Sequence, residues 1–349
     1  MIDHDQHMRR CLQLARNGTG GVAPNPLVGA VLVQGEGVLA EGWHRSYGGP
    51  HAEVECLRAF GDGPVPQDAV MYVNLEPCSH HGKTPPCIDM LIDRGARKVV
   101  VGCEDPNPVV QGAGIARLRA AGIEVVTDVL RDECRWLNRR FIHSMEQQRP
   151  YIILKWARSA DGYLDDHGRT ARISSPESDV LVHRWRSEEQ AIMVGSRTVT
   201  NDDPTLTVRH VEGKNPLRVV LDRKNRAAST SRIFDGSGPT LLFTGSLRAD
   251  VRADQHVISM SDDPIVTVLR ELQLRSIRSV LVEGGGELLG HFLSRGLWDE
   301  ARMITGRAES GVGTKAPAIH GDPARSSICG MDRIDLFTNG TYVADTWAW

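Results

Sequence analysis

The stretch that decides the fold of the first half is Leu75–Cys87, which reads LEPCSHHGKTPPC, taken together with the triplet HAE at residues 51–53. His51 opens a predicted helix. Cys78 follows a β-rich run, and Cys87 stands nine positions later at the start of another predicted helix. Side chains presented beside a sheet edge converge readily, and helix N-termini stabilise thiolates. We therefore expect His51, Cys78 and Cys87 to hold one metal ion.

Three protein ligands leave a fourth tetrahedral position for water, whereas a structural zinc site is normally closed by a fourth residue. Bound zinc lowers the pKa of water from ~15.7 to roughly 7, and Glu53, two residues after the histidine, is placed to move protons. This pattern is typical of zinc deaminases, although the second cysteine is more distant here. A closed structural site that uses His80 or His81 is the main alternative. A purely structural interpretation makes Glu53 a solvated charge and the cysteines buried hydrophobes.

Helical and β-rich patterns alternate through the first half of the chain, as expected for a sheet covered by helices. Apolar spacing over residues 5–16 predicts an amphipathic helix that ends at Asn17-Gly18. Strands are expected at 28–33, 70–75, 98–102 and 123–127, and helices at 52–60, 86–94, 115–121 and 132–140. The first domain is predicted to cover residues 1–146 and to be a zinc-dependent deaminase.

A break at residues 147–150, which read QQRP, precedes a new β-rich run at 151–156. The second half alternates again, and we place a second α/β domain at residues 150–349. Its expected strands are 191–194, 217–221, 240–244 and 279–282, and its expected helices are 177–185, 265–272 and 288–293. Gly284, Gly285 and Gly286 lie between a strand and a helix, where their amides are suited to a pyrophosphate, although such a run is more often a simple turn.

Composition limits the classes of function. The 349 residues exceed the size at which one core stops growing, and 40% are hydrophobic. A net charge of −3 gives no basic footprint for nucleic acid and favours small molecules. We find no signal peptide and no run of ~18 apolar residues, so we expect a cytoplasmic protein with no membrane partner. Seven cysteines without dense spacing do not suggest a disulfide framework.

The motifs resemble those of one family over nearly the whole chain. In the first half they are APNPLVG at 23–29, GWH at 42–44, HAEV at 51–54, the long insert of Leu75–Cys87, and EDPNP at 104–108. In the second half they are LKWARSADG at 154–162, VGSRTV at 194–199, DDPTLTVR at 202–209 and VEGGG at 282–286. The sequence resembles the bifunctional riboflavin-biosynthesis deaminase/reductase family. The resemblance implies a cytidine-deaminase-like three-layer domain followed by a dihydrofolate-reductase-like α/β domain.

The family resemblance also implies two activities. Zinc hydroxide would deaminate 2,5-diamino-6-ribosylamino-4(3H)-pyrimidinone 5′-phosphate at the ring carbon that bears the 2-amino group. NADPH would then reduce the ribosyl unit to ribityl by transferring hydride to the first carbon of the sugar. A homo-oligomer is implied as well.

Site residues are carried over from the family position by position. Substrate contacts are implied for Asn25, His44, Lys83, Asp105 and Asn107 in the first half, and for Thr170, Arg186, Leu206, Arg209 and Glu283 in the second. Cofactor contacts are implied for Ala157, Arg172, Thr198, Asp202, Gly284, Gly285 and Gly286. The chain departs from the family at three positions, having Arg172 in place of Trp, Ala160 in place of Leu and Gln190 in place of Asp. Residues 305–322 show no good match.

Two other functions remain open at this point. A nucleic-acid deaminase of the same fold is disfavoured by the negative net charge and by the appended second domain. Alternatively, the deaminase alone is active and the second half is a non-catalytic nucleotide-binding or assembly module. Consumption of NADPH distinguishes that alternative from the bifunctional enzyme.

Overall fold

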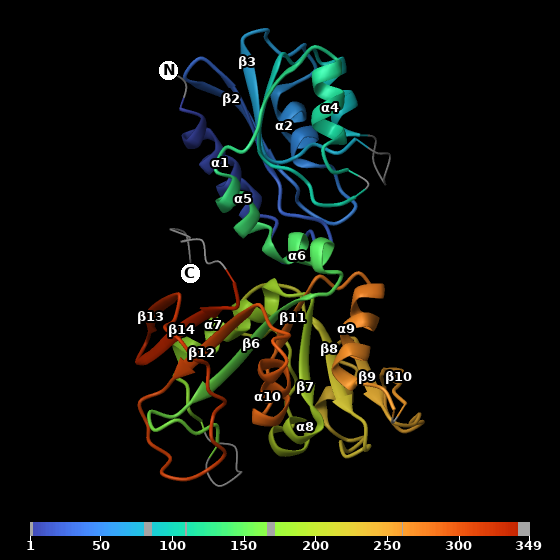
Figure 1. Ribbon diagram of the computed structural model, residues 1–349, viewed down its shortest axis with the longest axis vertical. Coiled ribbons are helices and arrows are strands. Elements are labelled where there is room, and N and C mark those ends of the chain that lie inside the picture. The colour runs from blue at the N-terminus through green and yellow to red at the C-terminus, as the bar shows by residue number, and fades with distance from the viewer. Residues whose placement is uncertain (1–2, 80–85, 109, 166–171, 260, 341–349) are drawn as a thin grey trace. The chain divides into compact units, whose positions relative to one another are not determined.

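The computed structural model describes residues 3–79, 86–108, 110–165, 172–259 and 261–340. The chain divides into two compact units between Gln148 and Arg149 (Figure 1). Each unit has its own sheet and its own buried core. Within the described residues, no helix is long and apolar enough to cross a membrane.

The first unit contains a five-stranded sheet in the order β2-β1-β3-β4-β5. β1 is antiparallel to both of its neighbours, whereas β3, β4 and β5 run parallel. The strands are β1 (Gly29–Gln34), β2 (Gly37–Trp43), β3 (Ala69–Leu75), β4 (Lys98–Cys103) and β5 (Glu124–Val126). Because β3 and β4 are parallel, the loops that follow them leave the sheet at the same edge.

Helices cover both faces of this sheet and give three layers, which confirms the predicted fold class (Figure 1). On β1, Ala30 and Leu32 pack toward one face, and Val31 and Val33 pack toward the other. This is the two-residue periodicity of a strand buried on both sides. The first face packs on α2 (Ala52–Phe60), α3 (Cys87–Asp93) and α4 (Ala113–Ala120), and the second on α1 (His4–Arg16) and α5 (Arg131–Leu137).

Two expectations for the first unit need correction. The helix predicted at 132–140 is two helices, α5 and α6 (Arg139–Gln147), which meet at Asn138. Asn138 is buried, and its side-chain amide accepts from Leu27 N at 2.7 Å and donates to Leu27 O at 2.9 Å. The strand β2 was not predicted, because its first three residues are exposed and it carries glycine at both Gly37 and Gly42.

Gly42 allows β2 to pack closely against α2, the helix whose N-cap is the expected metal ligand His51. A Cβ at this position would meet the backbone of Ala52 and Cys56 well inside van der Waals distance. The glycine is therefore required for the close approach of β2 to α2. That contact places the start of α2 firmly against the sheet.

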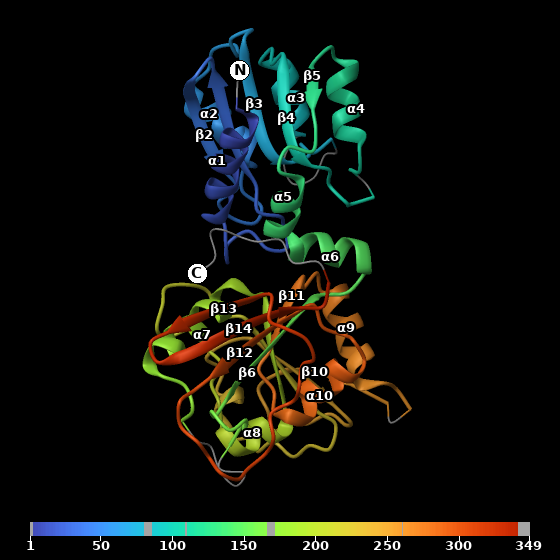
Figure 2. The same cartoon turned by 60° about the vertical axis from the view of Figure 1, so that its left-hand side comes forward.

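The second unit contains a nine-stranded sheet in the order β10-β9-β8-β7-β11-β6-β12-β14-β13. The seven strands from β10 to β12 are parallel to their neighbours, and β14 and β13 are antiparallel. Figure 2 shows β6, β12, β14 and β13 side by side at one edge. The strands are β6 (Tyr151–Arg158), β7 (Ala191–Gly195), β8 (Leu217–Asp222), β9 (Thr240–Thr244), β10 (Asp254–Val257), β11 (Ser279–Val282), β12 (Glu300–Thr305), β13 (Arg325–Cys329) and β14 (Asp332–Thr338).

Helices again pack on both faces of the sheet, as the α/β class predicted for this half requires. One face packs on α9 (Pro264–Leu274) and α10 (Gly286–Ser294). The other packs on α7 (Pro176–Glu188), α8 (Ser196–Asp202) and the short 3-10 helix η1 (Arg232–Phe234). The predicted strands and helices of this half are all present, and the structure adds β10, β12, β13, β14, α8 and η1.

The strand β12 was missed because charged residues interrupt its apolar pattern. Glu300 and Arg302 are both buried, and the Nε of Arg302 donates to Oε1 of Glu300 at 2.6 Å. Arg302 also lies 3.8 Å from the buried carboxylate of Glu189. These side chains form a paired buried network, which no alternation of apolar and polar residues predicts.

Candidate active sites

Three elements of the first unit deliver the expected metal ligands. His51 is the N-cap of α2, Cys87 is the first residue of α3, and Cys78 follows β3 after Glu76-Pro77. His51 Nδ1 lies 3.5 Å from Cys78 Sγ and 3.2 Å from Cys87 Sγ, and the three ligand atoms lie within 4.8 Å of one another. Tetrahedral zinc with bonds of about 2.0–2.3 Å places its ligand atoms roughly 3.5–3.8 Å apart. The three side chains therefore fit a zinc ion.

The surroundings of the Cys78 thiol favour a metal ligand, whereas the hydrogen bond with Cys78 and burial raise the pKa of the Cys87 thiol. The backbone N–H of Cys87 donates to Cys78 Sγ at 3.3 Å. The pKa of the Cys78 thiol is lowered to about 4, chiefly by the hydrogen bond with the Cys87 thiol and further by His51. A thiolate is the form of cysteine that binds metal. All seven cysteines of the chain are free, so none of the ligands is used in a disulfide.

Glu53 lies in the first turn of α2, close to the ligands. Its side chain is buried, and that burial raises the pKa of its carboxyl to about 7. The residue lines the same cavity as His51 and Cys78. A carboxyl group with a pKa near neutrality is suited to accept and return a proton.

The cavity beside the three ligands has a volume of about 250 Å³. His44 donates from Nδ1 to Pro50 O at 2.8 Å, so its Nε2 accepts from the Asn25 amide at 3.1 Å. Burial lowers the pKa of His44 and favours the neutral ring. Asp105 and Asn107 also line the cavity, and burial raises the pKa of Asp105 to about 6.

The structure thus brings Asn25, His44, Glu53, Asp105 and Asn107 together with the ligands His51 and Cys78 around one cavity. Lys83, together with His80 and His81 of the alternative closed site, lies outside the described residues. The cavity residues that sequence analysis missed include Tyr47, Glu76 and Phe141. The sequence did hold a signal for Glu76, because this residue stands two positions before the ligand Cys78 and is therefore expected near the metal site.

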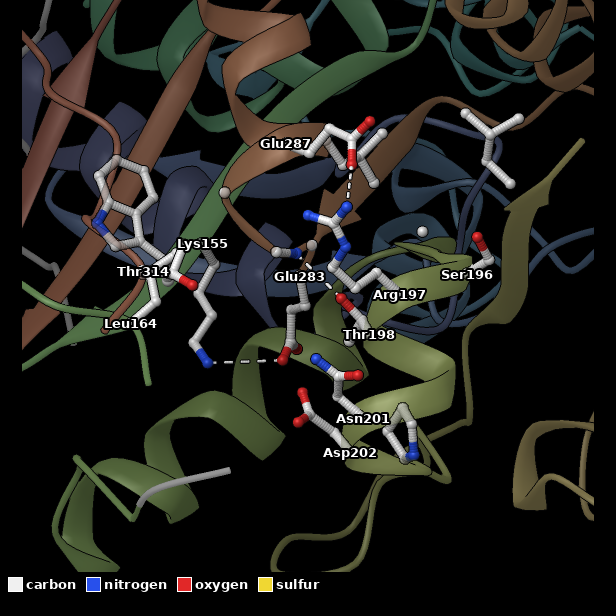
Figure 3. A pocket seen from close by; sticks show the side chains of 18 of the residues that line it. Lys155, Leu164, Ser196, Arg197, Thr198, Asn201, Asp202, Glu283, Glu287 and Thr314 are labelled. Atoms are coloured by element: carbon white, nitrogen blue, oxygen red, sulfur yellow. Dashed lines mark hydrogen bonds and ion pairs between the residues drawn. The ribbon is translucent and has the colours of Figure 1, made fainter. Parts of the chain in front are cut away.

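The second unit contains a larger cavity, of about 1010 Å³. It is lined by the ends of several strands and by the starts of α8 and α10 (Figure 3). Ligands of open parallel sheets bind in such a crevice at the carboxyl ends of the strands. Of the residues predicted for this half, the cavity is lined by Ala157, Arg172, Arg186, Thr198, Asp202, Leu206, Glu283, Gly284, Gly285 and Gly286.

Glu283 is a firmly held charge in this cavity. Arg186 donates to it from Nε at 2.7 Å and from Nη2 at 2.8 Å, and Lys155 Nζ lies 3.5 Å away. Figure 3 shows Lys155 and Glu283 facing each other. Burial alone would raise the pKa of Glu283, but the charges of Arg186 and Lys155 outweigh it and lower that pKa to about 2. The carboxylate is therefore ionised and rigidly oriented.

The glycine run lies where a helix start meets the cavity. Gly285 is the N-cap of α10, and its N–H donates to the Thr198 hydroxyl at 3.0 Å. A Cβ on Gly284 would lie within 2.9 Å of Leu288 side-chain atoms, so the close packing of the turn on the helix requires glycine there. Backbone amides at a helix N-terminus are suited to phosphate groups.

The remaining site residues predicted for this half line the larger cavity, lie outside it, or fall outside the described residues. Arg209 does not line the cavity, and its guanidinium donates to the hydroxyls of Thr205 and Thr207. Arg172 is exposed and pairs with Asp179 at 3.2 Å. Leu206 is buried with a positive φ of 53°. Thr170 lies outside the described residues.

Lys155 and Thr314 line the larger cavity but were not predicted. A lysine within the apolar strand β6 was a usable signal, because a charge in a buried strand needs a partner. Thr314 was hidden in the unmatched stretch 305–322. The backbone of that stretch is held by Leu164 N–H, which donates to Thr314 O at 2.8 Å, and by the Asp161 carboxylate, which accepts from Ser310 and Gly311.

Comparisons with known proteins agree with both halves. Residues 1–103 match the model of the cytidine and deoxycytidylate deaminase zinc-binding region, and residues 150–327 match that of the RibD C-terminal domain. The riboflavin biosynthesis protein RibD of Synechocystis sp. is 40% identical over 85% of this chain and 82% of its own length.

Two solved structures are similar over most of the chain. A diaminohydroxyphosphoribosylaminopyrimidine deaminase/5-amino-6-(5-phosphoribosylamino)uracil reductase from Thermotoga maritima aligns with a TM-score of 0.86 at 35% identity. Acinetobacter baumannii RibD aligns with a TM-score of 0.87 at 32% identity. Each alignment covers 96% of this chain and 98% of the other.

The fold and the two sites define a zinc-binding deaminase joined to a reductase. Family models, relatives and solved structures agree on this class. The chain belongs to the RibD family, the bifunctional deaminases and NADPH-dependent reductases of riboflavin biosynthesis.

Proposed function

We propose that the first unit deaminates the pyrimidine ring of 2,5-diamino-6-ribosylamino-4(3H)-pyrimidinone 5′-phosphate. The observation that carries this proposal is the convergence of His51, Cys78 and Cys87 at a cavity that is lined by His51, Cys78 and the buried Glu53. The name of the Thermotoga maritima enzyme supports the substrate class.

His51, Cys78 and Cys87 would hold the zinc, which when bound supplies an activated water at neutral pH. The Glu53 carboxylate would take one proton from the attacking water and deliver it to the ring nitrogen. It would then take the second proton, from the hydroxyl on the tetrahedral carbon, and deliver it to the amine, which leaves as ammonia while the carbonyl forms. The neutral ring of His44 fixes the Asn25 amide, and Asn25, Asp105 and Asn107 offer polar atoms to the edge of the pyrimidine. Lys83 is proposed as a charge for the 5′-phosphate.

For the second unit, we propose that the larger cavity binds NADPH and the ribosyl end of the deaminated product. Ala157, Arg172, Thr198, Asp202 and the glycines 284–286 are proposed as cofactor contacts. Gly284, Gly286 and Glu287 at the start of α10 line the cavity, and the free N–H groups of a first helical turn support a cofactor phosphate at this helix start. Hydride transfer mainly requires that two bound molecules be positioned, and a cavity of about 1010 Å³ has room for both.

Glu283 is proposed to accept from the hydroxyls of the ribosyl chain, since its carboxylate is ionised and fixed by Arg186 and Lys155. Arg186 and Arg209 are proposed to supply positive charge for the substrate phosphate. Arg186 donates to Glu283 from Nε and Nη2, and its Nη1 donates to the backbone oxygen of Thr207 at 3.5 Å. Leu206 and Thr170 complete the proposed substrate contacts.

We further propose a cytoplasmic homo-oligomer that acts on a small molecule and not on nucleic acid. The free state of all seven cysteines supports a reducing compartment. The net charge of −3 supports a small-molecule substrate. The resemblance to the family supports the oligomer.

Removal of zinc is expected to abolish deamination and leave reduction intact. A chelator-treated enzyme should release no ammonia from the diaminopyrimidine phosphate above background, yet still oxidise NADPH when given the deaminated compound. Added zinc should restore ammonia release. Cys87→Ser should behave like the metal-free enzyme, and Cys56→Ser, a buried cysteine of α2 that is not a ligand, should behave like wild type. Deamination by metal-free protein would contradict the proposal.

A further inference from the structure

Glu76 lines the smaller cavity together with the ligands His51 and Cys78 and with Asp105 and Asn107. It follows the last residue of β3, stands two residues before Cys78, and is buried. Its Oε2 accepts from the backbone N–H groups of Asp105 at 3.2 Å and Gly112 at 3.0 Å. Its Oε1 accepts from those of Gly114 at 2.9 Å and Ile115 at 3.2 Å.

These four amides come from the loop after β4, whose residues Asp105 and Asn107 line the cavity, and from the start of α4. Gly112, Gly114 and Ile115 belong to the N-terminal cap and first turn of α4, whose free N–H groups need acceptors. Asp105 is the second residue of the loop that follows β4, and its Oδ1 accepts from Asn107 N at 2.8 Å. A chain of hydrogen bonds therefore runs from Glu76 through Asp105 to Asn107.

The packing around Glu76 is as specific as its hydrogen bonds. A Cβ added to Gly114 would lie 2.9 Å from Glu76 Oε1 and still closer to the carbonyl oxygen of Pro77. The start of α4 can therefore approach the Pro77-Cys78 turn only because residue 114 is glycine. Glu76, Cys78, Asp105 and Asn107 all line the same cavity.

We propose that Glu76 is a positioning residue of the deaminase, which sets the distance between the substrate-facing loop of Asp105 and Asn107 and the metal-binding turn at Cys78. This inference rests on the proposed deaminase function of the cavity. A carboxylate suits the place because it offers only acceptors to four converging donors. Glutamine has the same shape but would turn an N–H₂ group toward two of those donors.

Glu76→Gln is expected to raise the KM for the diaminopyrimidine phosphate by about 10–100-fold, as expected when hydrogen bonds to a charged acceptor are lost. We expect kcat to change much less, because Glu53 and the three ligands keep their places. Zinc content, measured by metal analysis, should stay at the wild-type level. The reductase of the same polypeptide serves as an internal reference and should be unchanged.

Gly114→Ala tests the contact between Glu76 and the start of α4 from the side of the helix. It tests the positioning role of Glu76 even if the Glu76→Gln variant does not fold. It should raise KM in the same direction with zinc retained. Asp3→Ala, which removes the N-cap of α1 in the same unit, is the matched control and should leave KM unchanged. An unchanged KM in the folded variants, or loss of zinc along with activity, would overturn the positioning role. Absence of deaminase activity in the wild-type enzyme would instead refute the proposed function itself.

Discussion

Glu53→Gln is expected to lower the kcat of deamination by about 10²–10⁴-fold, the usual contribution of a positioned general acid–base. Glu53 is buried beside the three ligands, and its pKa of about 7 allows it to hold and release a proton at neutral pH. Glutamine preserves the volume of the side chain but carries no transferable proton. Ammonia release from the diaminopyrimidine phosphate measures the effect, and zinc content should equal that of wild type.

Glu55→Gln provides a matched control on the same helix. Glu55 lies in the first turn of α2 like Glu53, but it pairs with Arg45 and Arg58 and does not line the cavity. We expect this variant to keep near-wild-type deamination. A Glu53→Gln enzyme that retains zinc and deaminates within a few-fold of wild type would show that Glu53 is not the proton carrier.

Arg186→Met is expected to abolish reduction and to destabilise the second unit by about 3–5 kcal/mol, the usual cost of removing one partner of a buried ion pair. The side chains of Arg186 and Glu283 are only 12% and 9% exposed, so Glu283 would remain charged and buried with Lys155 at 3.5 Å. The measurements are denaturant unfolding and NADPH oxidation. Arg184→Met, which alters an exposed arginine of the same helix, is the control.

The double variant Arg186→Met/Glu283→Gln separates stability from function. It removes both partners of the ion pair but leaves Lys155, whose side chain is 14% exposed, without its carboxylate, so only part of the stability should return while reduction stays absent. Because the pKa of Glu283 is lowered to about 2, the stabilisation by its charge is present in full above its unfolded pKa of about 4.3 and is lost as pH falls toward 2. Reduction at wild-type rates by the stable double variant would refute the proposed role of the pair.

Periodicity predicted the elements that carry the metal ligands, because those elements are regular. Apolar spacing located α1 and α2, and unbroken apolar runs located the buried strands β3 and β4. The ligand pattern itself was legible because His51, Cys78 and Cys87 each stand at a helix start or directly after a strand. At these positions the residue types that bind zinc coincide with the helix starts and strand ends that the sequence predicts.

Elements whose burial depends on specific partners could not be predicted in this way. β12 carries the buried pair Glu300 and Arg302. Without knowledge of this pairing, the sequence of β12 is typical of an exposed polar segment. Asn138 interrupts a helical pattern because its amide binds the backbone of the distant Leu27. In the larger cavity, Lys155 meets Glu283 across two strands that are more than a hundred residues apart in the sequence.

The most direct test of the bifunctional assignment is a mass-spectrometric time course of the zinc-loaded enzyme with the diaminopyrimidine phosphate, with and without NADPH. We predict exchange of one amino group for oxygen without NADPH, followed by addition of two hydrogens only when NADPH is present. Exchange without any reduction would contradict the assignment of the second unit, and absence of exchange would contradict the assignment of the first.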